Sequence, residues 1–412
     1  MNIPTLNSST FKQREREVGK AVEIVAKTSC QESLNEERSQ ALCSGSQPDE
    51  NNLVSVHCSF DMGWQKRGKG HNSRTGHAAV MSLTTGKVLD YTTKTKSCRF
   101  CDYAKGSNKT AKAHDCRKNH TASSKAMEPA SAVEMFSNAP KQGVKFSMYT
   151  GDDDSTTEAH IREKVTYKVE KFSDIVHMKR SLTTRLYNLS QNGKFPGCSI
   201  LSQKVINYLV KCFSYGIAQN KGNPKGIQAT IQCIVPHAFG DHTNCEIAWC
   251  GFKENPISYK HKDLPYGKDL FGDKLKSALE HIFNDYSTEA VAEKLAPLLN
   301  SQRNEALNSI VGSKNPKIRF YGGSESNDFR VACGVAQHNL RYEYVNRTLK
   351  ELNNHPENFC LSFNQKRTEK VLKDKIRKSK RNLIGEELKS ILRIALRLLE
   401  RNLKREKLTK LE

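Results

Sequence analysis

Apolar and polar residues alternate in several short segments of the first half of the chain, and segments with helical spacing separate them. Residues 11–26 have the spacing of a helix, and the polar stretch 31–52 has the composition of a linker. Alternating patterns then predict five strands, at 53–60, 78–83, 87–93, 144–149 and 167–175. Helical patterns at 124–139 and 155–165 lie between the later strands. The predicted order is therefore strand, hairpin, helix, strand, helix, strand.

Helical spacing predominates in the second half of the chain. It covers most of 178–300, another helix is predicted to start near Gln302, and a basic helical tail is expected at 365–412. No apolar run approaches 18 residues, and the N-terminus lacks an apolar signal segment. The sequence therefore predicts a protein kept inside the cell, without a membrane-spanning helix.

Three acidic residues stand in settings that suit a metal site. Asp61 follows the first strand pattern, Asp152 follows the fourth, and Glu305 lies at the start of the helix near Gln302. A ribonuclease H-like fold, which is an α/β fold with a mixed sheet, gathers carboxylates from such distant positions. Mg²⁺ and Mn²⁺ prefer carboxylate oxygens, and two such ions can clamp the attacking and leaving oxygens of a phosphodiester. The pattern therefore predicts a two-metal site that acts on nucleic acid strands.

Each of these acids also has an ordinary structural explanation. An aspartate after a strand is often a turn or cap residue, and an acidic run at 152–154 suits a helix N-terminus. Asp154 is the alternative to Asp152 as the second metal ligand. Asp174 and His177 are three residues apart, which is the spacing of a local hydrogen-bonded pair or of an auxiliary pair that orients a catalytic residue or a phosphate.

The net charge is strongly positive, because 66 Lys and Arg residues stand against 44 Asp and Glu residues, which gives +22. Clustered cations gain free energy by releasing counterions from phosphates, so the charge favours a nucleic acid partner over a membrane surface. The basic run at 373–381 is either a solvated helix face or a nuclear-import or phosphate-binding segment.

A first zinc site is predicted from the spacing of Cys98, Cys101, His114 and Cys116. Thiolates and imidazole suit tetrahedral Zn²⁺, and four protein ligands leave no open position, so the predicted role is structural. His120 is an alternative to His114 or Cys116.

A second zinc site is a weaker prediction, from His237, His242, Cys245 and Cys250. Four candidate ligands within fourteen residues suit a small zinc knuckle. The alternative explanation is buried cysteines and capping histidines that bind no metal.

An ordered set of motifs then resembles the Mutator-like transposase domain of animal DNA transposons, with part of the pattern shared by Kyakuja–Dileera–Zisupton transposases. The motifs are Ser59-Phe-Asp-Met-Gly-Trp-Gln-Lys-Arg-Gly68, Ser124-Lys-Ala-Met-Glu-Pro129, Gly151-Asp-Asp-Asp-Ser155, Pro236-His-Ala-Phe-Gly-Asp-His-Thr-Asn-Cys245 with Trp249-Cys250, and Asn304-Glu-Ala-Leu-Asn308. The resemblance spans roughly residues 50–340.

The resemblance implies a DDE triad at Asp61, Asp152 and Glu305, and a (C/D)xxH element that Asp174 and His177 match. It also implies transposon ends and target DNA as partners, a homo-oligomer when active, and a nuclear location. Two departures stand out. A run of three aspartates replaces the commoner Gly-Asp-Gly-Asp, which leaves the second ligand open, and the short polar N-terminus shows no complete site-specific DNA-binding domain.

The expected organisation has three parts. Residues 1–50 form a helix and a polar linker, 51–340 form the transposase domain, and 341–412 form the basic tail. The domain carries a zinc-binding insert at 97–120 and a helical insertion at 178–300. A DNA transposase is the favoured function; the alternatives are a catalytically silent, transposase-derived DNA-binding protein and an unrelated zinc-dependent interaction module. Retention of all three acids favours the enzyme, because clustered carboxylates facing DNA do not help a protein that only binds.

Overall fold

The computed structural model describes residues 7–65, 73–152, 154–191, 198–374 and 376–377. The chain divides into two compact units, one made of Met1–Val25 with Leu340–Glu412 and the other of Ala26–Asn339. Among the described residues, none of the helices combines the length and the apolar character that crossing a membrane requires.

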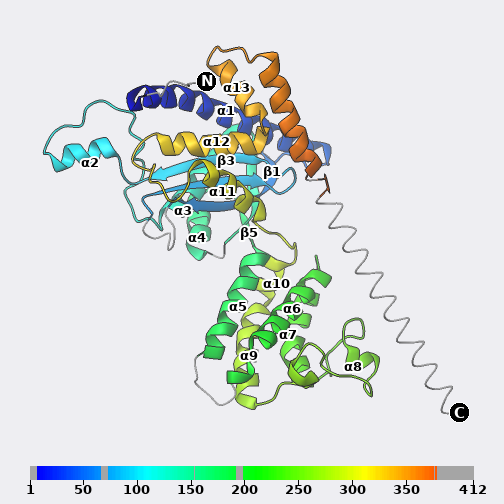
Figure 1. The fold of residues 1–412 in the computed structure, drawn as a ribbon. Coiled ribbons are helices and arrows are strands. Elements are labelled where there is room, and N and C mark those ends of the chain that lie inside the picture. The colour runs from blue at the N-terminus through cyan, green and yellow to red at the C-terminus, as the bar shows by residue number, and fades with distance from the viewer. Residues whose placement is uncertain (1–6, 66–72, 153, 192–197, 375, 378–412) are drawn as a thin grey trace. The chain divides into compact units, whose positions relative to one another are not determined.

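The larger unit contains a five-stranded mixed sheet (Figure 1). Its strands are β1 (Val54–Trp64), β2 (Thr75–Ser82), β3 (Val88–Thr95), β4 (Val144–Gly151) and β5 (Glu170–Ser173). The order across the sheet is β3-β2-β1-β4-β5; β2 is antiparallel to both β1 and β3, whereas β4 is parallel to both β1 and β5. Each strand overlaps a segment whose alternation predicted it, so the mixed α/β class is confirmed.

Helices α3 (Met127–Asn138) and α4 (Ser155–Lys164) lie where helical spacing predicted them. Phe136 of α3 makes edge-to-face contacts with Phe60, Phe146 and Tyr149 of the strands. These rings belong to a continuous core of buried apolar side chains between the sheet and the helices. Such burial is the main favourable contribution to folding.

Strand β1 is longer than its alternating pattern indicated, because pairing with β2 continues to Trp64 opposite Gly76. The predicted end at residue 60 is therefore wrong. Asp61 lies inside the strand, opposite Ala79, and does not follow it.

The N-terminal helix is also longer than predicted: α1 runs from Ser8 to Cys43, where a linker was expected from residue 31. Leu34 joins the apolar core of the larger unit. The Glu37 carboxylate accepts hydrogen bonds from the Ser82 hydroxyl and the Thr85 backbone N–H. These contacts come from the tertiary structure, so local composition did not reveal them.

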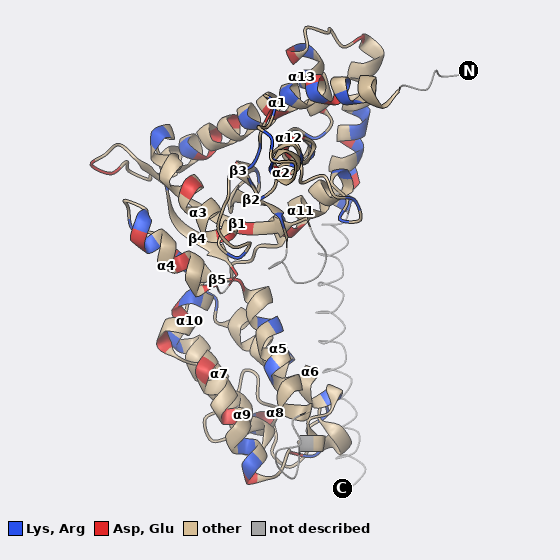
Figure 2. Cartoon of the chain, turned by 90° about the vertical axis from the view of Figure 1, so that its left-hand side faces the viewer, with Lys and Arg blue, Asp and Glu red and all other residues tan. Residues whose placement is uncertain are grey.

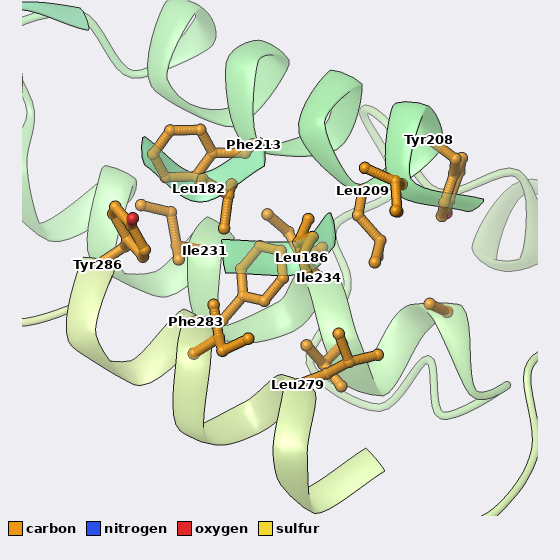
Figure 3. Close-up of a cluster of buried hydrophobic side chains, with 14 of the residues drawn as sticks. Leu182, Leu186, Tyr208, Leu209, Phe213, Ile231, Ile234, Leu279, Phe283 and Tyr286 are labelled. Atoms are coloured by element: carbon orange, nitrogen blue, oxygen red, sulfur yellow. The ribbon is translucent and has the colours of Figure 1, made fainter. Parts of the chain in front are cut away.

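The helices in the segment predicted as a helical insertion pack around a core of their own (Figure 3). Its helices are α5 (Ile175–Gln191), α6 (Gln203–Gln219), α7 (Pro224–Ala238), α8 (Gly251–Glu254), α9 (Asp273–Tyr286) and α10 (Glu289–Leu295). Leu182, Phe213 and Phe283 are almost completely buried in this core. Short 3₁₀ turns lie at Ala139–Gln142, Cys198–Ile200 and Pro265–Gly267.

After the insertion the chain returns to the sheet through α11 (Gln302–Lys314), followed by α12 (Ser326–Leu340). The buried Asn304 side chain accepts from the Ser59 hydroxyl and donates to the Ala79 carbonyl, which fixes α11 against β1 and β2. Earlier in the chain, α2 (Arg99–Gly106) lies in the predicted zinc-binding insert.

The smaller unit contains the first part of α1, α13 (Glu343–Glu351) and a helix over 358–374. The Asn364 amide donates to Asn346 over 2.8 Å, which joins these last two helices. The predicted basic tail is helical where it is described; residue 375 and all residues from 378 onward lie outside the described residues.

Basic residues are distributed over many helices and are interleaved with acidic ones (Figure 2). The net charge of +22 is nevertheless unevenly spread along the sequence, because residues 361–412 contain 17 Lys and Arg residues against 7 Asp and Glu residues.

Candidate carboxylate site and metal centres

Asp61 lies in β1, and Asp152 directly follows the neighbouring parallel strand β4. Ser59 is paired with Thr150, so two residues further along each strand Asp61 comes opposite Asp152 on the same face. A Cβ atom on Gly151 would lie 2.8 Å from the Phe60 carbonyl oxygen, so glycine permits this close approach of the strands. Of the predicted acidic residues, these two are brought together by the sheet itself.

The electrostatic environment of Asp61 reflects this arrangement. Burial, followed by the charge of Asp152, raises the pKa of Asp61 to about 6. Asn308 donates to the Asp61 carboxylate over 2.7 Å and partly offsets the rise. A divalent cation would relieve the repulsion between the two aspartates and lower this pKa.

A two-step hydrogen-bond chain orients Asp61. His77 Nε2 lies 2.9 Å from the Asn308 side-chain oxygen, and because that oxygen can only accept, His77 donates. Burial lowers the pKa of His77 to about 4, so its ring is neutral. A Cβ atom on Gly63 would collide with His77, at 2.4 Å, and with the Asn308 oxygen, at 2.8 Å. The sequence patterns did not indicate that His77 and Asn308 would support Asp61.

His177 contacts Asp152. Its Nδ1 atom lies 3.0 Å from the Asp152 carboxylate, and this hydrogen bond is the largest cause of the raised pKa of His177. His177 is in the first turn of α5, so the helix holds it beside the end of β4.

Asp174 has a different role from that of His177. Its side chain is buried and caps α5 by accepting from the backbone N–H groups of Val176 and His177. Its other oxygen accepts from the Ser301 backbone N–H at 2.7 Å and from the Ser301 hydroxyl at 2.5 Å. Asp174 therefore connects the end of β5 to the residue that precedes α11.

Asp154 caps helix α4. Burial would raise its pKa, yet the net shift is downward because Thr157 and Thr156 donate hydrogen bonds to its carboxylate. This is the N-terminal capping role that the sequence offered as the ordinary explanation. Asp153 lies outside the described residues.

Glu305 lies exposed in the first turn of α11. Asn308, three residues later and on the same side of the helix, is the residue of α11 that donates to Asp61. Among the described residues, the oxygens of Asp61, Asp152 and Glu305 do not gather within 4.8 Å of one another. Carboxylates without a cation between them repel one another.

The four predicted ligands of the first Cys/His cluster lie within 4.8 Å of one another and could hold a metal such as zinc. The Cys98 and Cys101 sulfurs lie 3.1 and 3.5 Å from His114 Nε2, and the Cys101 and Cys116 sulfurs are 3.7 Å apart. Zn–S bonds of 2.3 Å and Zn–N bonds of 2.0–2.1 Å imply tetrahedral edges of about 3.6 Å for S–N and about 3.8 Å for S–S. His114 Nδ1 donates to the Lys112 carbonyl, which leaves Nε2 free for a metal. All four predicted ligands therefore converge.

His120 does not join this cluster. Its ring donates to the Ser123 carbonyl over 2.9 Å. His120 therefore has a local structural role, and the four residues that converge are Cys98, Cys101, His114 and Cys116.

The second cluster converges in the same way. The Nδ1 atoms of His237 and His242 are 3.0 Å apart, and the Cys245 and Cys250 sulfurs lie 3.4–4.0 Å from them. Burial lowers the pKa of both histidines, to about 4 for His237, so both rings are neutral as metal ligands must be. These four residues could also hold a metal such as zinc.

Residues 1–250 match the profile of the Mutator-like transposase family. The chain belongs to this family. No curated protein matches the sequence.

The family match covers Asp61, Asp152, His177 and both Cys/His clusters, and it ends before Glu305. The family match therefore indicates a transposase-related function, and the matched part of the chain contains the two aspartates and the Cys/His clusters. The third acid lies beyond this part.

Glu128 is an acidic residue of this transposase-family region that sequence reasoning missed. It lies in the first turn of α3. Burial, followed by the charges of Asp61, Asp152 and Asp154, raises the pKa of Glu128 to about 8. It is part of the quoted motif Ser124–Pro129, so its position in that motif was the available signal. Nothing in the local sequence indicated that α3 directs it toward the aspartates.

The first cluster is anchored to the rest of the larger unit. Arg117, next to Cys116, forms an ion pair of 3.3 Å with Asp328 and lies over the Phe329 ring of α12. The Arg99 backbone N–H, next to Cys98, donates to the Gly323 carbonyl over 2.9 Å. A metal bound here would therefore order the insert together with the segment that leads into α12.

Proposed function

We propose that this chain is a DDE-type DNA transposase that cleaves and joins DNA strands at a site containing Asp61, Asp152 and Glu305. The observation that carries the proposal is that Asp152 directly follows β4, whose register with β1 brings it beside Asp61. The upward shift in the pKa of Asp61, caused first by burial and then by Asp152, supports it. Such carboxylate pairs are suited to divalent cations.

The sheet supports a ribonuclease H-like assignment. Its order is β3-β2-β1-β4-β5, with an antiparallel hairpin on one side of β1 and parallel strands on the other. After the helical insertion, α11 returns to pack against β1 and β2. This is the arrangement in which a first strand, a fourth strand and a late helix contribute to one site.

The residues have distinct roles in this proposal. Asp61 and Asp152 hold the cations, and Glu305 completes the site from α11. Two Mg²⁺ or Mn²⁺ ions bound there would activate water and then a 3′-hydroxyl for in-line attack on a DNA phosphodiester. Asn308 orients Asp61, and His177 orients Asp152. Asp154 is the capping residue, and Glu128 adds a fourth carboxylate facing the pair.

The partners follow from the same proposal. Transposon ends and target DNA are the substrates, and the net charge of +22 favours their phosphates. Zn²⁺ at the two Cys/His clusters is structural, because each cluster supplies four ligands. A homo-oligomer in the nucleus is the expected active form.

A catalytically silent DNA-binding derivative is the second candidate. Asn308, which is not a carboxylate, is the α11 residue that contacts Asp61, and this observation favours the silent form. Such a protein would keep the zinc clusters and the positive charge but lose cleavage.

The test uses the full chain, purified with zinc, and a supercoiled plasmid carrying the genomic sequences that flank its coding region. We expect nicking and joining that require Mg²⁺ or Mn²⁺ and that fall at least about 100-fold in Asp61→Asn and in Asp152→Asn, because each change removes a charge that holds a cation. Binding to the same DNA should persist in both variants.

Asp263→Asn serves as the matched control, because Asp263 is an exposed aspartate paired with Lys211 in the helical insertion. It should cleave like the unchanged chain. Cleavage that survives in both active-site variants would place the chemistry elsewhere, and DNA binding without any cleavage in the unchanged chain would favour the silent derivative.

A further inference from the structure

A basic cavity of about 370 Å³ lies where β1 and β2 meet the segment between α11 and α12. Its lining includes Gln65, Arg74, Lys317, Ile318, Arg319 and Phe320. None of these residues belongs to the metal clusters or to the proposed carboxylate site.

The charge of this cavity is entirely positive. Arg74, Lys317 and Arg319 are exposed, and none of them forms an ion pair with a carboxylate in the part of the chain that the structure describes. Elsewhere an exposed cation can be paired with an acid, as Lys211 is with Asp263. Three unbalanced cations around one cavity favour an anionic ligand with several charges, such as a phosphate backbone.

The cavity also presents an exposed aromatic ring. Phe320 is 55% exposed, and the neighbouring Ile318 is 76% exposed. The ring lies close to Gly322 and Gly323, where added Cβ atoms would lie 3.0 and 3.6 Å from it. Glycine therefore leaves room for the ring, which rests against backbone and keeps solvent-exposed surface.

Buried hydrogen bonds hold the segment that carries the ring. The Gln65 amide donates to the Arg319 carbonyl over 2.9 Å, and its oxygen accepts from the Thr75 hydroxyl. The Gly323 carbonyl accepts from the Arg99 N–H of the zinc-binding insert. The segment is thus fixed from the sheet and from the insert, so it is organised before a ligand arrives.

The cavity lies along the same strand as the proposed carboxylate site. Gln65 follows Asp61 by four residues and therefore lies on the same face of the sheet, about 13 Å away. Lys317 is close enough to lower the pKa of His77, after the larger effect of burial, and His77 leads through Asn308 to Asp61. This separation corresponds to about four stacked nucleotides of one DNA strand, at 3.4 Å each.

We propose that this cavity binds an unpaired nucleotide of the DNA strand beside the carboxylate site, and this inference rests on the proposed function. The base stacks on Phe320, and Arg74, Lys317 and Arg319 contact the adjoining phosphates. Duplex DNA does not fit this role, because its base faces are covered by neighbouring base pairs. Phe320 should therefore give the protein a preference for single-stranded over double-stranded DNA.

The experiment measures binding of a fluorescein-labelled 12-nucleotide single strand, and of the same sequence as a duplex, to the zinc-loaded full chain without Mg²⁺. Phe320→Ala should weaken single-strand binding about 5- to 150-fold, the equivalent of about 1–3 kcal/mol of stacking on one base, and change duplex binding less than twofold. Phe320→Tyr, which keeps the ring, should bind like the unchanged chain. The double variant Lys317→Gln, Arg319→Gln should weaken both ligands and reduce the salt dependence.

Phe271→Ala is the matched control, because Phe271 is 70% exposed and lies in the helical insertion. The inference is overturned if Phe320→Ala binds the single strand within twofold of this control, or if it loses single strand and duplex equally. The Asp61→Asn variant separates this inference from the proposed function. If cleavage does not depend on Asp61 but single-strand binding depends on Phe320, the proposed catalytic site is wrong and the proposed nucleotide-binding role of the cavity stands.

Discussion

The Cys/His clusters and the carboxylate site are assembled in different ways. The ligands of the first cluster, Cys98 to Cys116, lie within nineteen residues, and their ligand atoms come within 4.8 Å of one another. Asp61 and Asp152 are 91 residues apart in sequence and meet only because β1 and β4 are neighbours in the sheet. Glu305 comes from a third element that follows the helical insertion.

The two kinds of site also differ in what holds them without a metal. In the second cluster, burial lowers the pKa of His237 and His242, so both rings are neutral. The carboxylate site brings acids together, and burial with mutual repulsion raises the pKa values of Asp61 and Glu128. The difference implies that zinc sites depend on local spacing, whereas the carboxylate site depends on the fold and on its supporting hydrogen bonds.

The largest expected effect concerns Glu305. Glu305→Gln should reduce plasmid cleavage and joining at least about 100-fold, because the amide keeps the shape but loses the charge that completes the cation site. Zinc content, measured by metal analysis, should remain unchanged. Glu293→Gln in α10 is the control. Full activity of Glu305→Gln, with loss of activity in Glu128→Gln, would show that α3 rather than α11 completes the site.

A smaller effect is expected for the residue that orients Asp61. Asn308→Ala should lower the cleavage rate about 10- to 100-fold, as is usual for residues that support a metal ligand. Because the Asn308 hydrogen bond lowers the pKa of Asp61, its loss should move the acid limb of the pH–rate profile to higher pH. A rate loss without this shift would indicate a general disturbance of α11.

Removal of the zinc ligands should have a local effect. The double variants Cys98→Ser, Cys101→Ser and Cys245→Ser, Cys250→Ser should each release one of two zinc equivalents, and each should lower the melting temperature on the order of 5 °C. The sheet should persist by circular dichroism, because neither cluster lies in it. Protein that contains no zinc before mutation would contradict the assignment.

The smallest expected effect is on the pH dependence of stability. The pKa values of Asp61 and Glu128 are raised to about 6 and about 8, so the folded state binds more protons than the unfolded state between about pH 4 and pH 8. In the absence of divalent cations, the free energy of unfolding should therefore fall as the pH rises through this window. Glu128→Gln should flatten this dependence and raise the melting temperature by a few degrees at pH 8.

Two measurements sharpen this prediction. Glu280→Gln, at a half-buried position of α9 in the helical insertion, should leave the pH dependence unchanged. Adding Mn²⁺ should stabilise the unchanged chain more at pH 8 than at pH 5.5, because protons compete with the cation for the carboxylates. Equal stabilisation at both pH values would contradict a carboxylate site.

Local patterns were sufficient to predict most of the secondary structure and the two Cys/His clusters. Alternation in β4 and helical spacing in α4 reflect which faces are buried, and ligand spacing within a short loop limits how far thiols and imidazoles can separate. The same reasoning failed for residues 31–43, because the helix there is stabilised by the contacts of Leu34 and Glu37 with distant parts of the larger unit.

The sequence alone determined that this is a mixed α/β chain with Cys/His clusters, acidic candidates and a positive charge. Only the tertiary structure decided which acids meet. Sheet register brings Asp152, just past β4, beside Asp61, and Asn308 of α11 donates a hydrogen bond to Asp61. Burial, followed by the charges of the aspartates, raises the pKa of Glu128. The tertiary structure also showed that Asp154 caps a helix and Asp174 connects two elements. The physical reason is that the role of a carboxylate depends on neighbours that are far away in sequence. The ligands of a Cys/His cluster, in contrast, are close together in the sequence itself.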